Sequence, residues 1–182
     1  MTFKLAFKYL LRLILLALLA ISIYLVNLFF MKPFSIDHFL AKETFLEIID
    51  SPESMTYIGI FDKYNWFTGH ASKLTIPSQK QLDRDKAKAR KILETLRSYD
   101  DENLSSIQRA SKKIAIFDTE NTLLRLETFP FHNYVLNQIG GAHIDMVEFM
   151  TDTHPIRNLP EAEAYIDRVR LFEDVFEGHL YE

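Results

Sequence analysis

Residues 158–178 read NLPEAEAYIDRVRLFEDVFEG and carry the strongest helical signal in the chain. Asn158 and Glu161 stand three positions apart, which is the spacing of a helix N-cap and the first-turn residue it bonds, and Pro160 lies in the first turn. Gly178 follows as a stop signal. Apolar residues recur at intervals of three and four, which predicts one long amphipathic helix: Ala162, Tyr165, Ile166, Val169, Phe172, Val175 and Phe176.

Three further capped starts lie upstream. Ser51-Pro52-Glu53 has the form of an N-cap followed by a first-turn proline, with Gly59 as the stop. Ser78-x-x-Gln81 opens a long charged helix that reaches to about Tyr99. Ser105-x-x-Gln108 opens a helix to about residue 128, whose apolar stripe is formed by Ile107, Ala110, Ile114, Phe117 and Leu124.

The remaining features agree with helices. Residues 60–77 show no regular spacing of apolar residues, which predicts a loop. We expect its aromatic side chains to hold the loop against the rest of the domain (Phe61, Tyr64, Trp66 and Phe67). The chain holds only 5 glycines and 6 prolines, which disfavours a turn-rich β fold. We therefore expect an all-α protein with about five or six helices after the N-terminal segment. Because the chain ends on an amphipathic helix with nothing left to cover it, we expect a partial domain.

The N-terminal segment predicts a membrane span. Leu13 to Phe30 contains no charge, and Tyr9 to Leu11 can extend this run, so residues 9–30 are long enough to cross a bilayer. A cleaved signal peptide with a small-x-small site at Ala20-Ile21-Ser22 is the alternative. The apolar run continues for eight residues beyond Ser22, which favours an uncleaved anchor.

Charge gives the expected orientation. Residues 1–32 carry Lys4, Lys8, Arg12 and Lys32 and no acid. The basic residues before the uncharged run predict that the N-terminus lies inside and that residues from about 33 face outward. The expected organisation is an anchor at 1–32 in the plasma (inner) membrane and a periplasmic or extracellular helical domain at 33–182. That domain holds 17 basic and 25 acidic side chains, so its charge of −8 disfavours nucleic-acid binding.

Candidate site residues cluster at 137–154. Two histidines and several carboxylates lie within twelve positions, and a metal site built from His143, Asp145, Asp152 and His154 is one interpretation. The histidine spacing suits zinc poorly, because no two histidines lie four apart. Acids in the first turn of a short helix are the simpler reading. We expect no metal ligand or catalytic residue here, and Asn137, Gln138 and His154 remain as residues that could border a cleft.

The chain lacks the common chemical signatures. It has no cysteine, which excludes disulfides and thiolate chemistry, and no His-Glu-x-x-His, Gly-x-Ser-x-Gly or phosphate-loop motif.

Several blocks resemble the bacterial domain-of-unknown-function 885 family. The similar elements are Val135-Leu136-Asn137-Gln138, Gly140-Gly141, the segment Phe149 to Pro155, the segment Ala164 to Val169, and the turn Asp50 to Ser54 with Gly59. The resemblance covers about residues 35 to 178. It implies a helical, zinc-dependent peptidase-like family whose metal motif lies in a C-terminal half.

No residue of this chain matches that metal motif, so the resemblance transfers no catalytic or metal residue, and zinc is expected only in full-length members. The first hypothesis is therefore a membrane-anchored scaffold portion of such a protein, inert without a missing or separately encoded C-terminal half. The alternative is a stand-alone membrane-anchored helical interaction module. A self-sufficient metalloenzyme is the third hypothesis.

Overall fold

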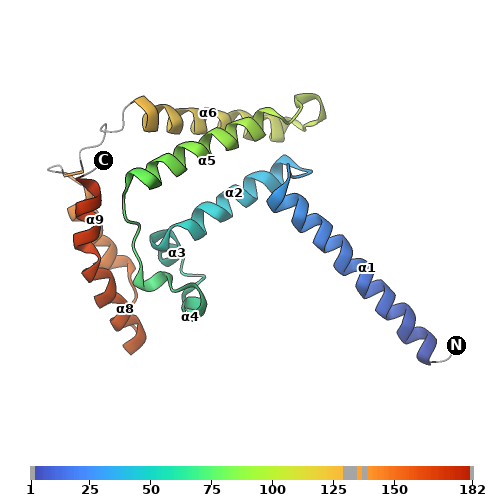
Figure 1. Ribbon diagram of the computed structural model, residues 1–182, viewed down its shortest axis with the longest axis horizontal. Coiled ribbons are helices and arrows are strands. Elements are labelled where there is room, and N and C mark those ends of the chain that lie inside the picture. The colour runs from blue at the N-terminus through green and yellow to red at the C-terminus, as the bar shows by residue number, and fades with distance from the viewer. Residues whose placement is uncertain (1–2, 129–134, 137–138, 181–182) are drawn as a thin grey trace. The chain divides into compact units, whose positions relative to one another are not determined.

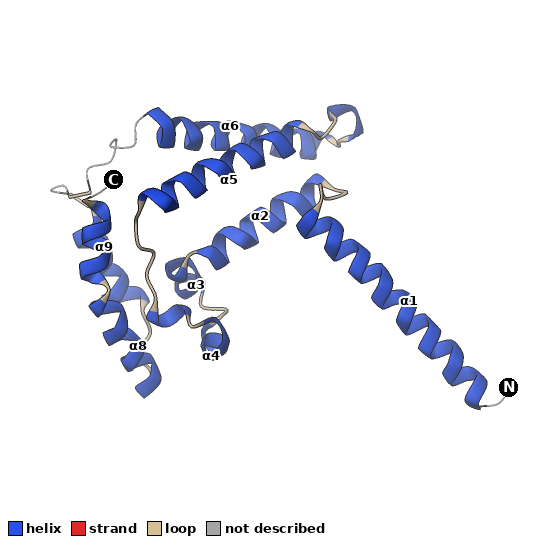
Figure 2. Ribbon diagram, in the orientation of Figure 1, coloured by secondary structure: helices blue, strands red, loops and turns tan. Residues whose placement is uncertain are grey.

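The computed structural model describes residues 3–128, 135–136 and 139–180 (Figure 1). Helices account for the regular structure throughout these residues (Figure 2), and the sole extended pairing among them is an isolated bridge between Leu136 and Gly141. The expected all-α class is confirmed. The chain divides into two compact units, residues 1–44 and 45–182.

The first unit contains α1 (Phe3–Phe30) and the start of α2 (Ile36–Asp50). Within α1, the 24-residue stretch Phe7–Phe30 contains an 18-residue window with a mean hydropathy of 2.7, so this helix is long and apolar enough to cross a membrane. A signal sequence near an N-terminus would meet the same criterion. Asn27 caps the helix end, because its Nδ2 donates to the Lys32 carbonyl at 2.8 Å and its Oδ1 accepts from Phe34 N at 2.9 Å.

The second unit begins with the end of α2 and with α3 (Pro52–Ile58). Ser51 caps α3 by accepting from Ser54 N at 3.1 Å, and Gly59 ends it with φ of 71°, as the sequence predicts. The segment predicted as a loop instead forms three short helical turns: η1 (Asp62–Tyr64), α4 (Asn65–Thr68) and η2 (His70–Ser72).

Of the four aromatic residues expected to pack this segment down, Phe61 is half-buried and the other three are exposed. Tyr64, Trp66 and Phe67 are 57%, 83% and 79% exposed, whereas His70 and Ala71 are buried. The segment is held through η2, which contacts α3 and α8 (Leu159–Arg170). Polar contacts, rather than the aromatic rings, therefore fix its position.

Helices α5 (Gln79–Arg97) and α6 (Ser106–Thr128) form a hairpin joined by η3 (Asp101–Asn103). Both predicted caps are present, and Ser105 and Gln108 make the full reciprocal capping box, at 3.0 and 3.2 Å. The apolar stripe predicted for α6 lies along one face of the helix. Its residues face solvent, and α5 packs on the other side of α6, around the buried Lys112.

The C-terminal part contains α7 (Ala142–Glu148), the π-helical turn η4 (Phe149–Thr153), α8 and α9 (Phe172–His179). Asn158 caps α8 as predicted, accepting from Glu161 N at 3.0 Å. The single helix predicted over 158–178 is wrong, because it breaks at Leu171, where ψ is −4°. Gly178 lies inside α9 and packs directly against Pro77, a tertiary contact that local sequence does not encode.

Candidate functional site

Arg168 of α8 is completely buried and is the centre of the second unit's polar interior. Its guanidinium reaches three carbonyls, since Nε donates to Lys73 O at 2.9 Å and Nη2 donates to His70 O at 2.9 Å and Pro52 O at 3.2 Å. Nη2 also lies 2.7 Å from Thr56 Oγ1. We call Arg168 and its hydrogen-bonding partners the arginine hub.

The arginine hub contains no carboxylate partner for Arg168 among the residues that the structure describes. Peptide carbonyls and a hydroxyl accept hydrogen bonds from the guanidinium but carry no negative charge. Burial lowers the pKa of Arg168 to about 10. The guanidinium still carries its charge at neutral pH. Its face lies over the Phe149 ring, with Cζ 4.9 Å from the ring centre, which adds a cation–π contact.

His154 completes the arginine hub from the end of η4. Its Nδ1 lies 2.8 Å from Arg168 Nη1, and its Nε2 lies 3.2 Å from the Glu161 carbonyl. Because a guanidinium only donates, Nδ1 accepts and Nε2 carries the proton, so the ring is neutral. Burial is the main cause that lowers the pKa of His154, and the Arg168 charge adds to it.

His70 forms a second buried imidazole beside the arginine hub. Its Nδ1 lies 2.7 Å from Thr68 Oγ1, and its Nε2 lies 3.7 Å from Asp62 Oδ1 without a hydrogen-bond partner. Burial is the first cause that lowers the pKa of His70, and the Arg168 charge is the second. The Asp62 carboxylate is shared between two groups, because its other oxygen accepts from Arg157 Nη2 at 2.7 Å.

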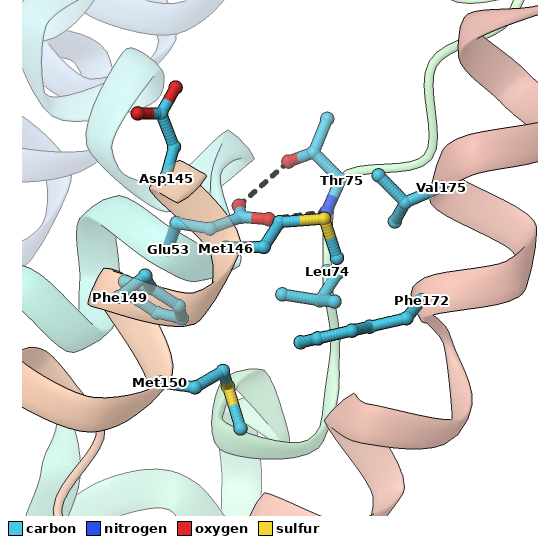
Figure 3. Close-up of a pocket in the computed structure, with 9 residues that line it drawn as sticks. All are labelled: Glu53, Leu74, Thr75, Asp145, Met146, Phe149, Met150, Phe172 and Val175. Atoms are coloured by element: carbon cyan, nitrogen blue, oxygen red, sulfur yellow. Dashed lines mark hydrogen bonds between the residues drawn. The ribbon is translucent and has the colours of Figure 1, made fainter. Parts of the chain in front are cut away.

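Phe149 also lines a cavity of about 250 Å³. Figure 3 shows Phe172 and Val175 of α9 facing Leu74, with Met146 and Met150 completing an apolar wall. Glu53 and Asp145 are the acidic residues of its lining, and Glu53 is held in place by Thr75. Its two carboxylate oxygens accept from Thr75 N at 2.6 Å and Thr75 Oγ1 at 2.8 Å, so this carboxylate is already engaged.

The geometry of the arginine hub and of the cavity indicates a role in stabilising the fold rather than in catalysis. The arginine hub is sealed from solvent, with Arg168 at 0% and His154 at 6% exposure, so its donors cannot reach a substrate. The cavity is apolar and suits the burial of an aliphatic or aromatic group.

The residues singled out in the sequence fall into three places. Asn137 and Gln138 lie outside the described residues, and their role at a cleft stays a prediction. His154 belongs to the arginine hub. His143, Asp145 and Asp152 are exposed on α7 and η4, and no group of three His, Asp or Glu side chains within 3–128, 135–136 and 139–180 is arranged to hold a metal ion.

Sequence reasoning missed Arg168 as a key residue. The available signal was its position in the amphipathic pattern of α8, since Arg168 lies one turn after Ala164 on the face that turns inward. An arginine on a buried face requires several acceptors, and here those acceptors come from distant segments that periodicity cannot identify.

A family model described as a bacterial protein of unknown function (DUF885) matches residues 52–181, which is more than half of the chain. The chain belongs to this family. The DUF885 match begins at Pro52, the first residue of α3, so it contains the whole arginine hub and every residue that lines the cavity. Residues 35–51, which the resemblance also covered, lie outside it. No curated protein and no solved structure matches this DUF885 chain.

Proposed function

We propose that this DUF885 chain is a membrane-anchored helical scaffold that binds a protein partner and has no catalytic centre of its own. The observation that carries the proposal is the outer face of α6. Ile107, Ile114 and Phe117 on that face are 77%, 69% and 68% exposed, and Leu124 is 54% exposed. We call this surface the α6 outer face. An aligned set of large apolar side chains in water marks an interaction site, since burying each one contributes roughly 1.5–3 kcal/mol.

The arginine hub supports a scaffold role. It joins α3, η2, η4 and α8 through hydrogen bonds that span up to 116 residues of sequence. A buried charge with this many directional contacts is compatible with only one arrangement of those segments. The arginine hub contains no residue of α6, so it fixes the part of the second unit formed by α3, η2, η4 and α8, while α6 is held by its packing on α5.

The anchor part of the proposal rests on α1. We propose that residues 9–30 cross the plasma membrane with the N-terminus in the cytoplasm, because Lys4 and Lys8 precede the span and Arg12 lies at its N-terminal end. The helical part then faces the periplasm or the cell exterior. The peptidase-like chemistry and zinc that the resemblance implies do not form part of this proposal, because no residue here matches the family's metal motif.

Site-specific photocrosslinking tests the scaffold proposal in the native membrane. A photoreactive side chain at position 117 of the full-length chain is expected to give a protein adduct on irradiation. Glu94 is the matched control position, because it is exposed on α5 away from the α6 outer face. Absence of any adduct at 117, or adducts of equal yield at 94, contradicts partner binding. Hydrolysis of a peptide library by the purified chain with zinc contradicts the absence of a catalytic centre.

A further inference from the structure

The α6 outer face follows a heptad repeat. Its residues are spaced alternately three and four apart, the a and d spacing of a coiled-coil seam. All six are exposed, and in chain order they are Ile107, Ala110, Ile114, Phe117, Asn121 and Leu124. They form three successive a–d pairs of such a seam.

This seam is separate from the contact inside the hairpin. The opposite side of α6 carries the buried Lys112 and the half-buried Ala115, Ile116 and Leu123, and it packs on α5. Lys112 Nζ is bonded there to Tyr99 O and Asp101 Oδ1, both at 2.6 Å. The hairpin is thus already closed on its inner side, and the outer seam is a second packing surface.

Asn121 indicates what kind of helix fits this seam. A single asparagine at an a position of a coiled coil fixes register, because its amide is satisfied only when another polar group faces it. In a parallel pair of identical helices, Asn121 of one copy faces Asn121 of the other. Its Nδ2 already reaches Phe117 O at 2.9 Å, which leaves the amide oxygen to accept across the seam.

Flanking charges indicate the same partner. Parallel coiled coils pair a g position with the e position five residues later on the other helix. Here these pairs are Lys113 with Asp118 and Glu120 with Arg125, and each pair joins opposite charges. All four side chains are exposed. Glu120 uses one oxygen to accept from Arg97 Nη2 at 2.6 Å, so its other oxygen remains for Arg125 of the second copy.

We propose that the α6 outer face is a self-association seam, on which α6 of a second copy of this chain docks parallel and in register. This proposal rests on the proposed function, in which the α6 outer face binds a protein, and it identifies that protein as a second copy of the same chain. Lys113–Asp118 and Glu120–Arg125 contacts flank an apolar seam in which Asn121 sets the register.

Single cysteines test the arrangement, because the natural chain has none. Ile107→Cys, Asn121→Cys and Leu124→Cys are each expected to form a disulfide-linked homodimer when the full-length chain is oxidised in lipid nanodiscs. Exposed Glu94→Cys is the control and is expected to stay monomeric. Circular dichroism verifies that each variant retains its helices.

The pattern of crosslinks separates the alternatives. Positions 107 and 124 are about 26 Å apart along the helix, far beyond disulfide reach. A crosslink that forms only between Ile107→Cys and Leu124→Cys chains therefore indicates an antiparallel pair and overturns the proposed arrangement. Adducts at 117 with a different protein, with no cysteine homodimer, overturn self-association and leave the scaffold function standing. No adduct of any kind overturns both.

A charge swap adds an independent test. Lys113→Glu places two like-charged pairs in the parallel dimer and is expected to raise the dissociation constant about tenfold. Lys113→Glu combined with Asp118→Lys restores opposite charges and is expected to recover the original constant. Equal weakening by the single and the double variant contradicts the parallel pairing.

Discussion

Nη1 of Arg168 lies 2.8 Å from Nδ1 of His154, so a group that can only donate meets a ring nitrogen that has to accept. This contact fixes the neutral form of the imidazole and supplies one acceptor to a fully buried cation. It also couples the end of η4 to α8. Two properties of the second unit, its stability and its response to acid, follow from this pair.

We expect Arg168→Met to destabilise the fold strongly. The substitution leaves three carbonyls, the Thr56 hydroxyl and His154 Nδ1 without their buried donor. The expected loss is about 3–5 kcal/mol, because buried acceptors lose their partner without gaining water. Thermal unfolding of the full-length chain in detergent, followed by circular dichroism, measures it. Arg170→Met is the matched control, since Arg170 is 73% exposed in its pair with Asp167 and should change little.

We expect stability to fall on acidification below about pH 6.5. Burial and Arg168 lower the pKa values of His154 and His70 from 6.5 in the folded chain. The unfolded chain therefore binds more protons in this range, so stability is complete above the unfolded pKa and is lost as pH falls below it.

His154→Gln tests the source of this pH dependence. Its side-chain oxygen can accept from Arg168 but cannot be protonated, so the loss of stability between pH 7 and 5 is expected to be shallower. His143→Gln, at an exposed position, is the control. An unchanged profile in His154→Gln would show that other groups cause the acid response.

We expect Gly178→Ala to destabilise the packing of α9. A Cβ at this position would overlap the Pro77 carbonyl oxygen and lie 3.1 Å from Pro77 Cδ, so the backbones would have to separate. The expected cost is about 1–3 kcal/mol. Gly140→Ala is the control, because nothing lies within 4 Å of its Cβ position. Denaturant unfolding of both variants measures the difference, and equal midpoints would contradict the close contact.

We expect the second unit to face away from the cytoplasm on an uncleaved anchor. In the cysteine-free chain, Glu163→Cys on α8 should react with a membrane-impermeant maleimide in intact cells, whereas Thr2→Cys should react only after lysis. The mature protein should keep residues 1–32, which mass spectrometry of its N-terminal peptide can detect. A shorter product would identify a cleaved signal, and the reverse labelling pattern would exclude the proposed orientation.

The sequence predicted the helix N-caps correctly, because capping involves only residues close together in the chain. The caps at Ser51, Ser78 and Asn158 form where expected, because each needs only a side chain and a backbone N–H three residues later. The candidate span and the all-α class followed from composition and periodicity in the same way.

Features that depend on distant segments were not predicted. The apolar stripe on α6 was recognised from the spacing of its residues. This spacing does not determine which of the two apolar faces of α6 packs against α5. The break at Leu171 has no glycine or proline signal, and the arginine hub joins α8 to segments about a hundred residues earlier. The metal-like cluster at 143–154 shows the same limit, because spacing along the chain did not place those side chains together.

The sequence separation within the arginine hub has a consequence for biosynthesis. Pro52, His70 and Lys73 leave the ribosome long before Arg168, which follows them by 116, 98 and 95 residues. Their carbonyls have no buried donor until α8 is translated, so α3 and η2 can dock only late, when most of the chain has been made. Closure of these long loops is therefore expected to slow the folding of the second unit.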